Sequence, residues 1–220
     1  MRFSNPKNIT AICLTSFLSV LLILVLDSFP LNYWIKSVVK LTTWSMSIYI
    51  ACKPNPLSIF KPRLSKSFVW TIVLSTIVMF IIIGLAKPLI PLFNLQQTQG
   101  HIAAIGVTDN YVLVSLYIIF INCTLEEIFF RGMCMLKLVE NSNRTFAIMY
   151  SSILFAIYHI PMMSKILPVY LTILCLVALF FAGIIFAMLN NETKNIYNAW
   201  VVHACTNVAL QYFGYILIQT

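Results

Sequence analysis

The sequence contains little charge, and acid is its scarcest kind. Only 9% of its 220 residues are charged, and Asp and Glu number 6 against 14 Lys and Arg. Soluble domains typically carry about 25% charged residues, whereas 60% of this chain is hydrophobic and its mean hydropathy is +0.92. The composition therefore excludes a soluble globular protein and indicates an integral membrane protein with several spans.

Long apolar runs take the place of the missing charge. A hydrocarbon core about 30 Å thick requires about 20 apolar residues per helix. We therefore predict an all-α, polytopic transmembrane bundle of about seven helices, within a range of about six to eight. We treat residues 1–110 as N-terminal helices and loops and residues 111–220 as the functional core of one integral membrane domain. The predicted spans are Ile9–Leu26, Leu31–Cys52, Phe68–Ala86, Tyr111–Leu138, Arg144–Met163, Ile166–Leu189 and Asn195–Ile218.

The second of these spans is the least apolar. Lys36, Lys40, Thr43 and Ser47 fall on one stripe of a helix. Such a stripe predicts that the segment either lines the interior of the bundle or lies in the membrane interface. If this second segment does not cross the membrane, the predicted orientation of the first helix in the membrane reverses.

The net charge of +8 could suggest a nucleic-acid partner, but the distribution of the basic residues argues against one. If seven helices alternate, Lys87 and Lys165 are the only basic residues that fall clearly in the loops of one side. The excess on the other side is the positive-inside pattern, which predicts a cytoplasmic N-terminus and no nucleic acid. The residues on that side are Arg2, Lys7, Lys53, Lys61, Arg63, Lys66, Arg131, Lys137, Arg144 and Lys194.

Several hydrolytic motifs are missing. The sequence contains no His-Glu-x-x-His and no Gly-x-Ser-x-Gly, which are the patterns of zinc proteases and serine hydrolases. Its only aspartates, Asp27 and Asp109, fall at loop positions, so no intramembrane aspartate pair is available. The cysteines are scattered singly and are expected to be small buried hydrophobes. Hydrolysis without a covalent protein nucleophile remains, carried out by a carboxylate, imidazoles and water.

Two adjacent carboxylates, Glu126 and Glu127, follow the uncharged run Tyr111–Leu125. An unpaired charge within hydrocarbon costs about 2.5–3.5 kcal/mol, so these residues are functional candidates. Glu127 and Arg131 are spaced i,i+4 with the acid first, which favours an ion pair. Glu126 is turned about 100° away on a regular helix and has no cation nearby in sequence. We therefore expect Glu126 to be the free carboxylate.

Two imidazoles lie on later predicted helices. Phe155 and His159 are spaced i,i+4, so the aromatic ring can shield the imidazole. His203 and Asn207 have the same spacing and can face one point. At about 1.5 Å per residue, Glu126, His159 and His203 reach similar depths. We predict that they meet in the inner half to the middle of the bilayer, in a site entered from the cytoplasm.

These motifs, in this order on successive membrane helices, resemble those of the CAAX protease and bacteriocin-processing family, also called the Abi family. Its members are glutamate-dependent intramembrane proteases, and the prenyl protease that trims CAAX tails is one of them. The resemblance covers roughly residues 122–208, whereas the first hundred residues match only as generic membrane helices. The motifs are Glu126-Glu127-x-x-x-Arg131, Phe155-x-x-x-His159 and His203-x-x-x-Asn207.

The resemblance implies a role for each motif residue. Glu126 and His159 would activate a water, while His203 and Asn207 would stabilise the oxyanion. The expected catalytic residues are therefore Glu126, His159, His203 and Asn207. Structural support is expected from Glu127, Arg131 and Phe155.

The same resemblance implies the surroundings of the reaction. The expected partners are a peptide or membrane-protein tail as substrate and the lipid bilayer. The short chain suggests a bacterial cell membrane, where prenylated substrates are not expected. No cofactor is favoured and no metal is assigned, although Glu126, His159 and His203 could also ligate zinc.

Two other functions stay open at this point. Family members also confer self-immunity to bacteriocins, and such a protein would show little or no proteolysis. A small transporter could use Glu126 and the histidines as a proton relay. The absence of an inverted repeat and of helices interrupted by Gly or Pro argues against the transporter.

Overall fold

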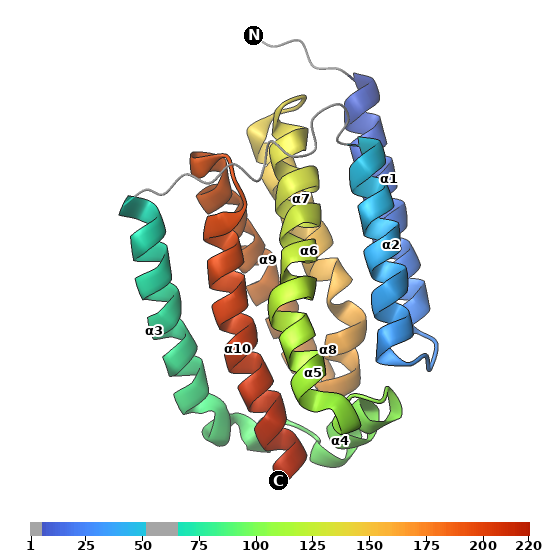
Figure 1. The fold of residues 1–220 in the computed structure, drawn as a ribbon, viewed down its shortest axis with the longest axis vertical. Coiled ribbons are helices and arrows are strands. Elements are labelled where there is room, and N and C mark those ends of the chain that lie inside the picture. The colour runs from blue at the N-terminus through green and yellow to red at the C-terminus, as the bar shows by residue number, and fades with distance from the viewer. Residues whose placement is uncertain (1–5, 52–65) are drawn as a thin grey trace.

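A computed structural model describes residues 6–51 and 66–220, and these residues contain helices and no strand. This confirms the prediction of an all-α polytopic bundle. The long helices run side by side, with α3 at one edge and the pair α1 and α2 at the other (Figure 1). The elements are α1 (Pro6–Asp27), α2 (Tyr33–Ala51), α3 (Lys66–Leu89), η2 (Ile90–Leu92), α4 (Leu95–Ala104), η3 (Thr108–Asn110), α5 (Tyr111–Leu116), η4 (Tyr117–Asn122), α6 (Cys123–Glu126), η5 (Glu127–Lys137), α7 (Arg144–Tyr158), α8 (Ile160–Ile166), α9 (Val169–Thr193) and α10 (Tyr197–Gln219).

Within the described ranges, six helical stretches are long and apolar enough to cross a membrane. They correspond to six of the predicted spans. Their bounds are Asn8–Asp27, Phe68–Leu92, Thr108–Lys137, Arg144–Ile166, Val169–Thr193 and Tyr197–Gln219.

The remaining predicted span forms α2, which lies alongside α1 over the same height of the bundle (Figure 1). Its buried face carries Ser37, Lys40, Trp44 and Ser47. Of the two alternatives for this polar stripe, the interior lining is therefore the one observed. These polar residues lower the hydropathy of α2, and they face the interior of the bundle.

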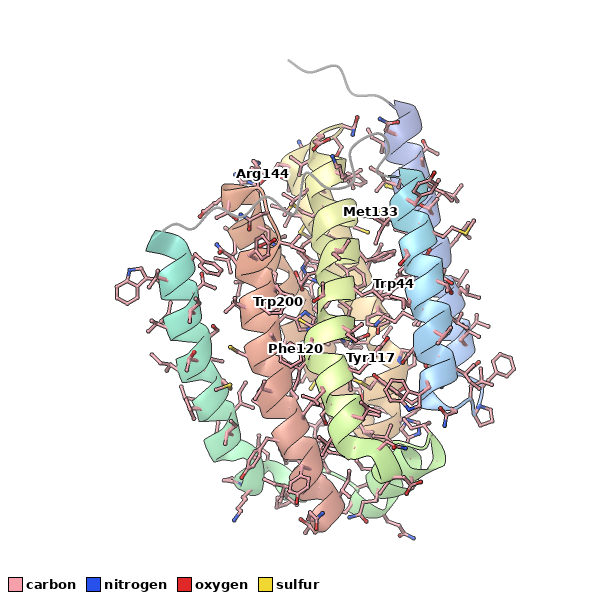
Figure 2. All side chains as sticks on the ribbon, in the orientation of Figure 1. Trp44, Tyr117, Phe120, Met133, Arg144 and Trp200 are labelled. Carbon is pink, nitrogen blue, oxygen red and sulfur yellow. The ribbon has the colours of Figure 1, made fainter. Side chains whose placement is uncertain are left out.

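The bundle core forms where α1, α2, η5 and α7 meet. The ring of Trp44 stacks on Phe129 with a centroid distance of 4.2 Å, and it lies between α2 and the central helix (Figure 2). Hydroxyl pairs join the same helices, with Ser19 Oγ 2.6 Å from Ser47 Oγ. Interhelical hydrogen bonds of this kind help to hold membrane helices together.

The central rod from α5 to η5 departs from regular α-helical geometry. The segments η4 and η5 are π-helical, which means that backbone hydrogen bonds join residues i and i+5. Ser151 on α7 donates its hydroxyl to the Phe130 carbonyl within η5 at 2.7 Å. The expected turn of 3.6 residues is therefore wrong for Tyr117–Asn122 and for Glu127–Lys137.

The predicted fifth span is broken at His159. The helix α7 ends at Tyr158, and α8 begins at Ile160 with Pro161 in its first turn. Two contacts fasten α8 to its neighbours: Lys165 donates to the backbone carbonyl of Asp27, and Thr98 donates to that of Ile166. His159 therefore lies at a fixed junction and not inside a continuous helix.

Both ends of the bundle agree with seven alternating segments. Residues 87–110, which connect the third and fourth predicted spans, lie at the end where α1 and α2 are joined, and they contain α4 (Figure 1). Lys137, Arg144 and Lys194 lie toward the opposite end. Arg2, Lys53, Lys61 and Arg63, and the side chains of Lys7 and Lys66, lie outside the described residues.

Candidate active site

The carboxylate of Glu126 lies in the interior of the bundle, at the end of α6, with 2% of the residue exposed. Its Oε1 atom accepts three hydrogen bonds: from Asn122 Nδ2 at 2.7 Å, from Lys40 Nζ at 2.8 Å and from the Tyr158 hydroxyl at 3.2 Å. Its Oε2 atom lies 3.6 Å from His203 Nε2, which is longer than a hydrogen bond. The two oxygens are therefore in different surroundings, and Oε2 retains its acceptor capacity.

The prediction that Glu126 is a free carboxylate is wrong. Lys40 on α2 forms an ion pair with it, and both side chains are buried. The expectation rested on cations within the same helix, whereas Lys40 lies on a different helix. Asn122, spaced i,i+4 from Glu126, and Tyr158, next to His159, were also missed. The spacing of Asn122 and the position of Lys40 on a polar stripe were the available signals.

Glu127 and Arg131 form the predicted ion pair, with Oε1 and Nη1 3.4 Å apart and both residues fully buried. Glu127 Oε1 also lies 2.8 Å from His203 Nδ1. A carboxylate can only accept here, so His203 donates its Nδ1–H. Glu127 therefore orients the His203 imidazole on α10 and also braces its own helix. The contact with His203 was not predicted from the sequence.

Aromatic rings surround the Arg131 guanidinium. Its Cζ atom lies 4.0 Å from the ring centroid of Phe155 and 4.9 Å from that of Phe186. None of its nitrogens has a hydrogen-bond partner among the described residues. Cation–π contacts of this kind are strongest where water is excluded. Arg131 is therefore held by Glu127 and by the faces of aromatic rings.

Phe155 joins the two histidines. Its ring centroid lies 4.7 Å from that of His159 and 5.9 Å from that of His203. This confirms that the aromatic ring packs on His159, and it adds contacts with His203 and Arg131. Glu126, His159 and His203 are thus brought together from three parts of the chain, as predicted.

The hydrogen bond of His159 defines its tautomer. Its Nδ1 atom lies 2.7 Å from the Phe155 carbonyl, which can only accept, so Nδ1 carries the proton. In the neutral ring Nε2 is then unprotonated and can accept a proton. His159 is half-buried at the α7–α8 junction, next to Tyr158, whose hydroxyl donates to Glu126.

Asn207 lies one turn beyond His203 on α10 and is 9% exposed. Its amide makes no hydrogen bond to any residue in the ranges that the structure describes. An amide with unused donors one turn from His203 can contact a bound group. His101, the third histidine, lies apart from these residues on α4, and burial together with Lys165 and Lys36 lowers its pKa.

The described residues include no group of three or more His, Cys, Asp or Glu side chains arranged to hold a metal ion. Oε1 of Glu126 is already paired with the Lys40 ammonium at 2.8 Å. The donor set therefore fits a zinc ion poorly.

Comparison with family models gives a match over residues 108–209. The model is that of Rce1-like proteins, described as type II CAAX prenyl endopeptidases. We refer to the matched residues 108–209 as the Rce1-like region. The match confirms the resemblance drawn from the motifs and supports an intramembrane protease of the CAAX type. Comparisons with curated proteins and with solved structures found no significant match.

The Rce1-like region begins at η3 and ends within α10. It therefore contains every motif residue from Glu126 to Asn207. Lys40, which binds Glu126, comes from α2 and lies outside it.

Proposed function

We propose that this protein is a glutamate-dependent intramembrane endopeptidase that cleaves a peptide or a membrane-protein tail. The observation that carries the proposal is the arrangement around Glu126. One carboxylate oxygen is held by donors from its own helix, α2 and α7, while the other faces His203. Apart from Lys40, the residues of this arrangement lie within the Rce1-like region. A buried carboxylate held in this way is suited to act as a general base.

In the proposed reaction, a water bound between Glu126 Oε2 and His159 Nε2 loses a proton to this pair. The water oxygen attacks the scissile carbonyl carbon, and the carbonyl oxygen becomes an oxyanion. Collapse of the tetrahedral intermediate breaks the C–N bond, and the proton passes to the leaving amine. Atoms and charge balance without a covalent bond to the protein.

Asn207 and His203 are the proposed donors to the oxyanion. Asn207 has an unused amide, and an oxyanion is stabilised by such donors mainly in the transition state. Because the Nδ1–H of His203 already points to Glu127, only its doubly protonated form carries an N–H at Nε2. Glu127 would then balance that imidazolium while it also balances Arg131.

We propose that catalysis does not depend on a metal. Support comes from the Lys40 ammonium beside Glu126 and from the acceptors already committed to Lys40, His203 and Arg131. The residues that would bind zinc, Glu126, His159 and His203, are assigned to proton transfer and to the oxyanion instead.

We further propose a bacterial cell membrane as the location, with the N-terminus on the cytoplasmic side. Support for the orientation comes from the basic residues Lys137, Arg144 and Lys194, which lie toward one end of the bundle, and from the positive-inside rule. Bacteriocin immunity without proteolysis is the alternative within the same family.

The test uses the purified full chain in liposomes and two internally quenched peptides. One peptide ends in a farnesylated Cys-aliphatic-aliphatic-X sequence, and the other is the same peptide without the farnesyl group. We expect the wild-type protein to cleave at least one of them well above Glu126→Gln, and to keep its rate after exhaustive chelation. Equal, background rates for both proteins would contradict the protease. Loss of activity on chelation, reversed by stoichiometric zinc, would contradict metal independence alone.

A further inference from the structure

All hydrogen bonds of the Lys40 side chain are with Glu126 or with residues that bind Glu126. Lys40 is 6% exposed and enters from α2. Its ammonium donates to Asn122 Oδ1 at 2.5 Å, to Glu126 Oε1 at 2.8 Å and to the Tyr158 hydroxyl. An ammonium has three protons, and three acceptors surround it. The ring centroids of Trp44 and Tyr158, each 4.5 Å from Nζ, complete its enclosure.

This complete set of partners narrows what Lys40 can do. It has no donor left for a substrate, so it is not suited to bind a substrate carboxylate or an oxyanion. Its effect must pass through Glu126. All of the donors to Oε1 are linked to Lys40, because Asn122 and Tyr158 each bind both the ammonium and the carboxylate.

We propose that Lys40 is a positioning residue that completes the general base from outside the Rce1-like region. It holds Oε1 of Glu126 in a network with Asn122 and Tyr158, keeps the carboxylate ionised, and so directs Oε2 toward the water. This inference rests on the proposed function, in which Glu126 is the base. The Rce1-like region alone therefore does not contain the complete site, because α2 supplies Lys40.

The charges around Glu126 set the expected pH dependence. Lys40 faces it from α2, His203 from α10, and Tyr158 and His159 from the end of α7. Glu127 and Arg131 follow on the same helix and are paired with each other. Lys40 is thus the one fixed cation among the described residues that contacts Glu126. Without it the buried carboxylate binds a proton more readily, and a protonated carboxylate cannot act as a base.

Lys40 could instead serve only to attach α2 to the central helix. The two roles differ in measurable ways, because attachment affects the amount of folded protein equally at every pH. A role through Glu126 changes kcat more at low pH than at high pH. It also predicts that a second cation, in Lys40→Arg, restores part of the activity.

The experiment measures kcat and KM against pH for the full chain in liposomes, with the quenched peptide that the wild-type protein cleaves. Lys40→Met keeps the length and removes the charge, and Lys40→Arg keeps the charge. Lys36→Met is the matched control, because Lys36 lies one turn away on the same helix and pairs with Asp27 at 3.2 Å. Rates are normalised to folded protein, measured by size exclusion and circular dichroism.

We expect kcat of Lys40→Met to fall by about 10²-fold at neutral pH, as for a misplaced catalytic group, with KM little changed. The acid limb of its pH–rate profile should move to higher pH, Lys40→Arg should recover part of kcat, and Lys36→Met should match the wild type. A Lys40→Met protein with the wild-type profile would overturn the inference. A loss of kcat in Lys40→Met that is the same at all pH values, and that Lys40→Arg does not relieve, would also overturn the inference. If the wild type does not exceed Glu126→Gln, the proposed function has failed, and not the role of Lys40 alone.

Discussion

The N-terminal helices and the Rce1-like region satisfy their buried polar groups in different ways. In α1 and α2 most of these groups are hydroxyls that donate to carbonyls of their own helix, as Ser16 does to Ile12 and Ser47 to Thr43. Residues 108–209 also bury charges and an imidazole, and both Glu126 and Glu127 face His203 on another helix. A hydroxyl can be satisfied by a carbonyl of its own helix, whereas Glu126 and Glu127 each also have a partner on another helix, Lys40 and His203 respectively. The charged groups therefore determine which helices must come together around the site.

Lys40 is the exception that connects the two regions. It is a buried charge in the N-terminal part, and its partner Glu126 lies in the family region. Removing one member of each kind of contact tests whether the two regions differ in this way.

The largest effect on stability is expected for the pair within the family region. Glu127→Gln leaves Arg131 as a buried charge without its ion pair, and breaking a buried pair costs about 3–5 kcal/mol. The double change Glu127→Gln with Arg131→Gln should recover much of this loss. Thermal unfolding in detergent and the amount of membrane-inserted protein measure both. If the single variants Glu127→Gln and Arg131→Gln are both as stable as the wild type, this ion pair does not brace the helix.

A smaller effect, confined to activity, is expected for the proposed oxyanion donor. Asn207→Ala removes an amide with no described protein partner, so stability should change little. Loss of one oxyanion donor lowers kcat by about 10²–10³-fold, and KM should stay near its wild-type value. Steady-state kinetics with the quenched peptide separate the two constants. A rise in KM at constant kcat would assign Asn207 to substrate binding instead.

The smallest effect is expected in the N-terminal helices. Ser47→Ala removes an interhelical hydroxyl contact with Ser19, and such membrane hydrogen bonds contribute about 0.6 kcal/mol on average. We expect a slight decrease in the unfolding temperature and an unchanged kcat. A loss as large as that of Glu127→Gln would show that hydroxyls and charges are equally important in this bundle, and the contrast between the regions would be removed.

The site residues could be predicted from the sequence because they are unlike their surroundings. Glu126, Glu127, His159, His203 and Asn207 stand out within apolar runs. The fold class followed from the same composition. Spacing within one helix also gave the contact of Glu127 with Arg131 and that of Phe155 with His159.

Contacts between helices could not be predicted in this way. The approach of Lys40 to Glu126 and of Glu127 to His203 depends on helix packing, which spacing along one chain segment does not define. The π-helical turns of η5 depend on a shifted backbone hydrogen-bond register. The break after Tyr158 coincides with Pro161, since proline lacks the N–H that a continuous helix would donate to the carbonyl four residues earlier.

Close helix approach is a further feature that a sequence pattern does not reveal. A Cβ added at Gly183 on α9 would lie 3.0 Å from the Cα of Ser152 on α7. Small residues at such positions let membrane helices pack closely. The contact holds α9, with Phe186, against the helix that carries Phe155, and both rings enclose Arg131.

The role of Glu126 as the base is best tested in a variant that leaves no buried charge without its partner. The double variant Lys40→Met with Glu126→Gln removes both members of the ion pair, so its unfolding temperature should lie closer to that of the wild type than that of Glu126→Gln alone. Its rate with the quenched peptide, per folded molecule, should be lower than the wild-type rate by about 10²–10⁴-fold, the usual contribution of a general base. A folded double variant that cleaves the peptide at the wild-type rate would contradict the account.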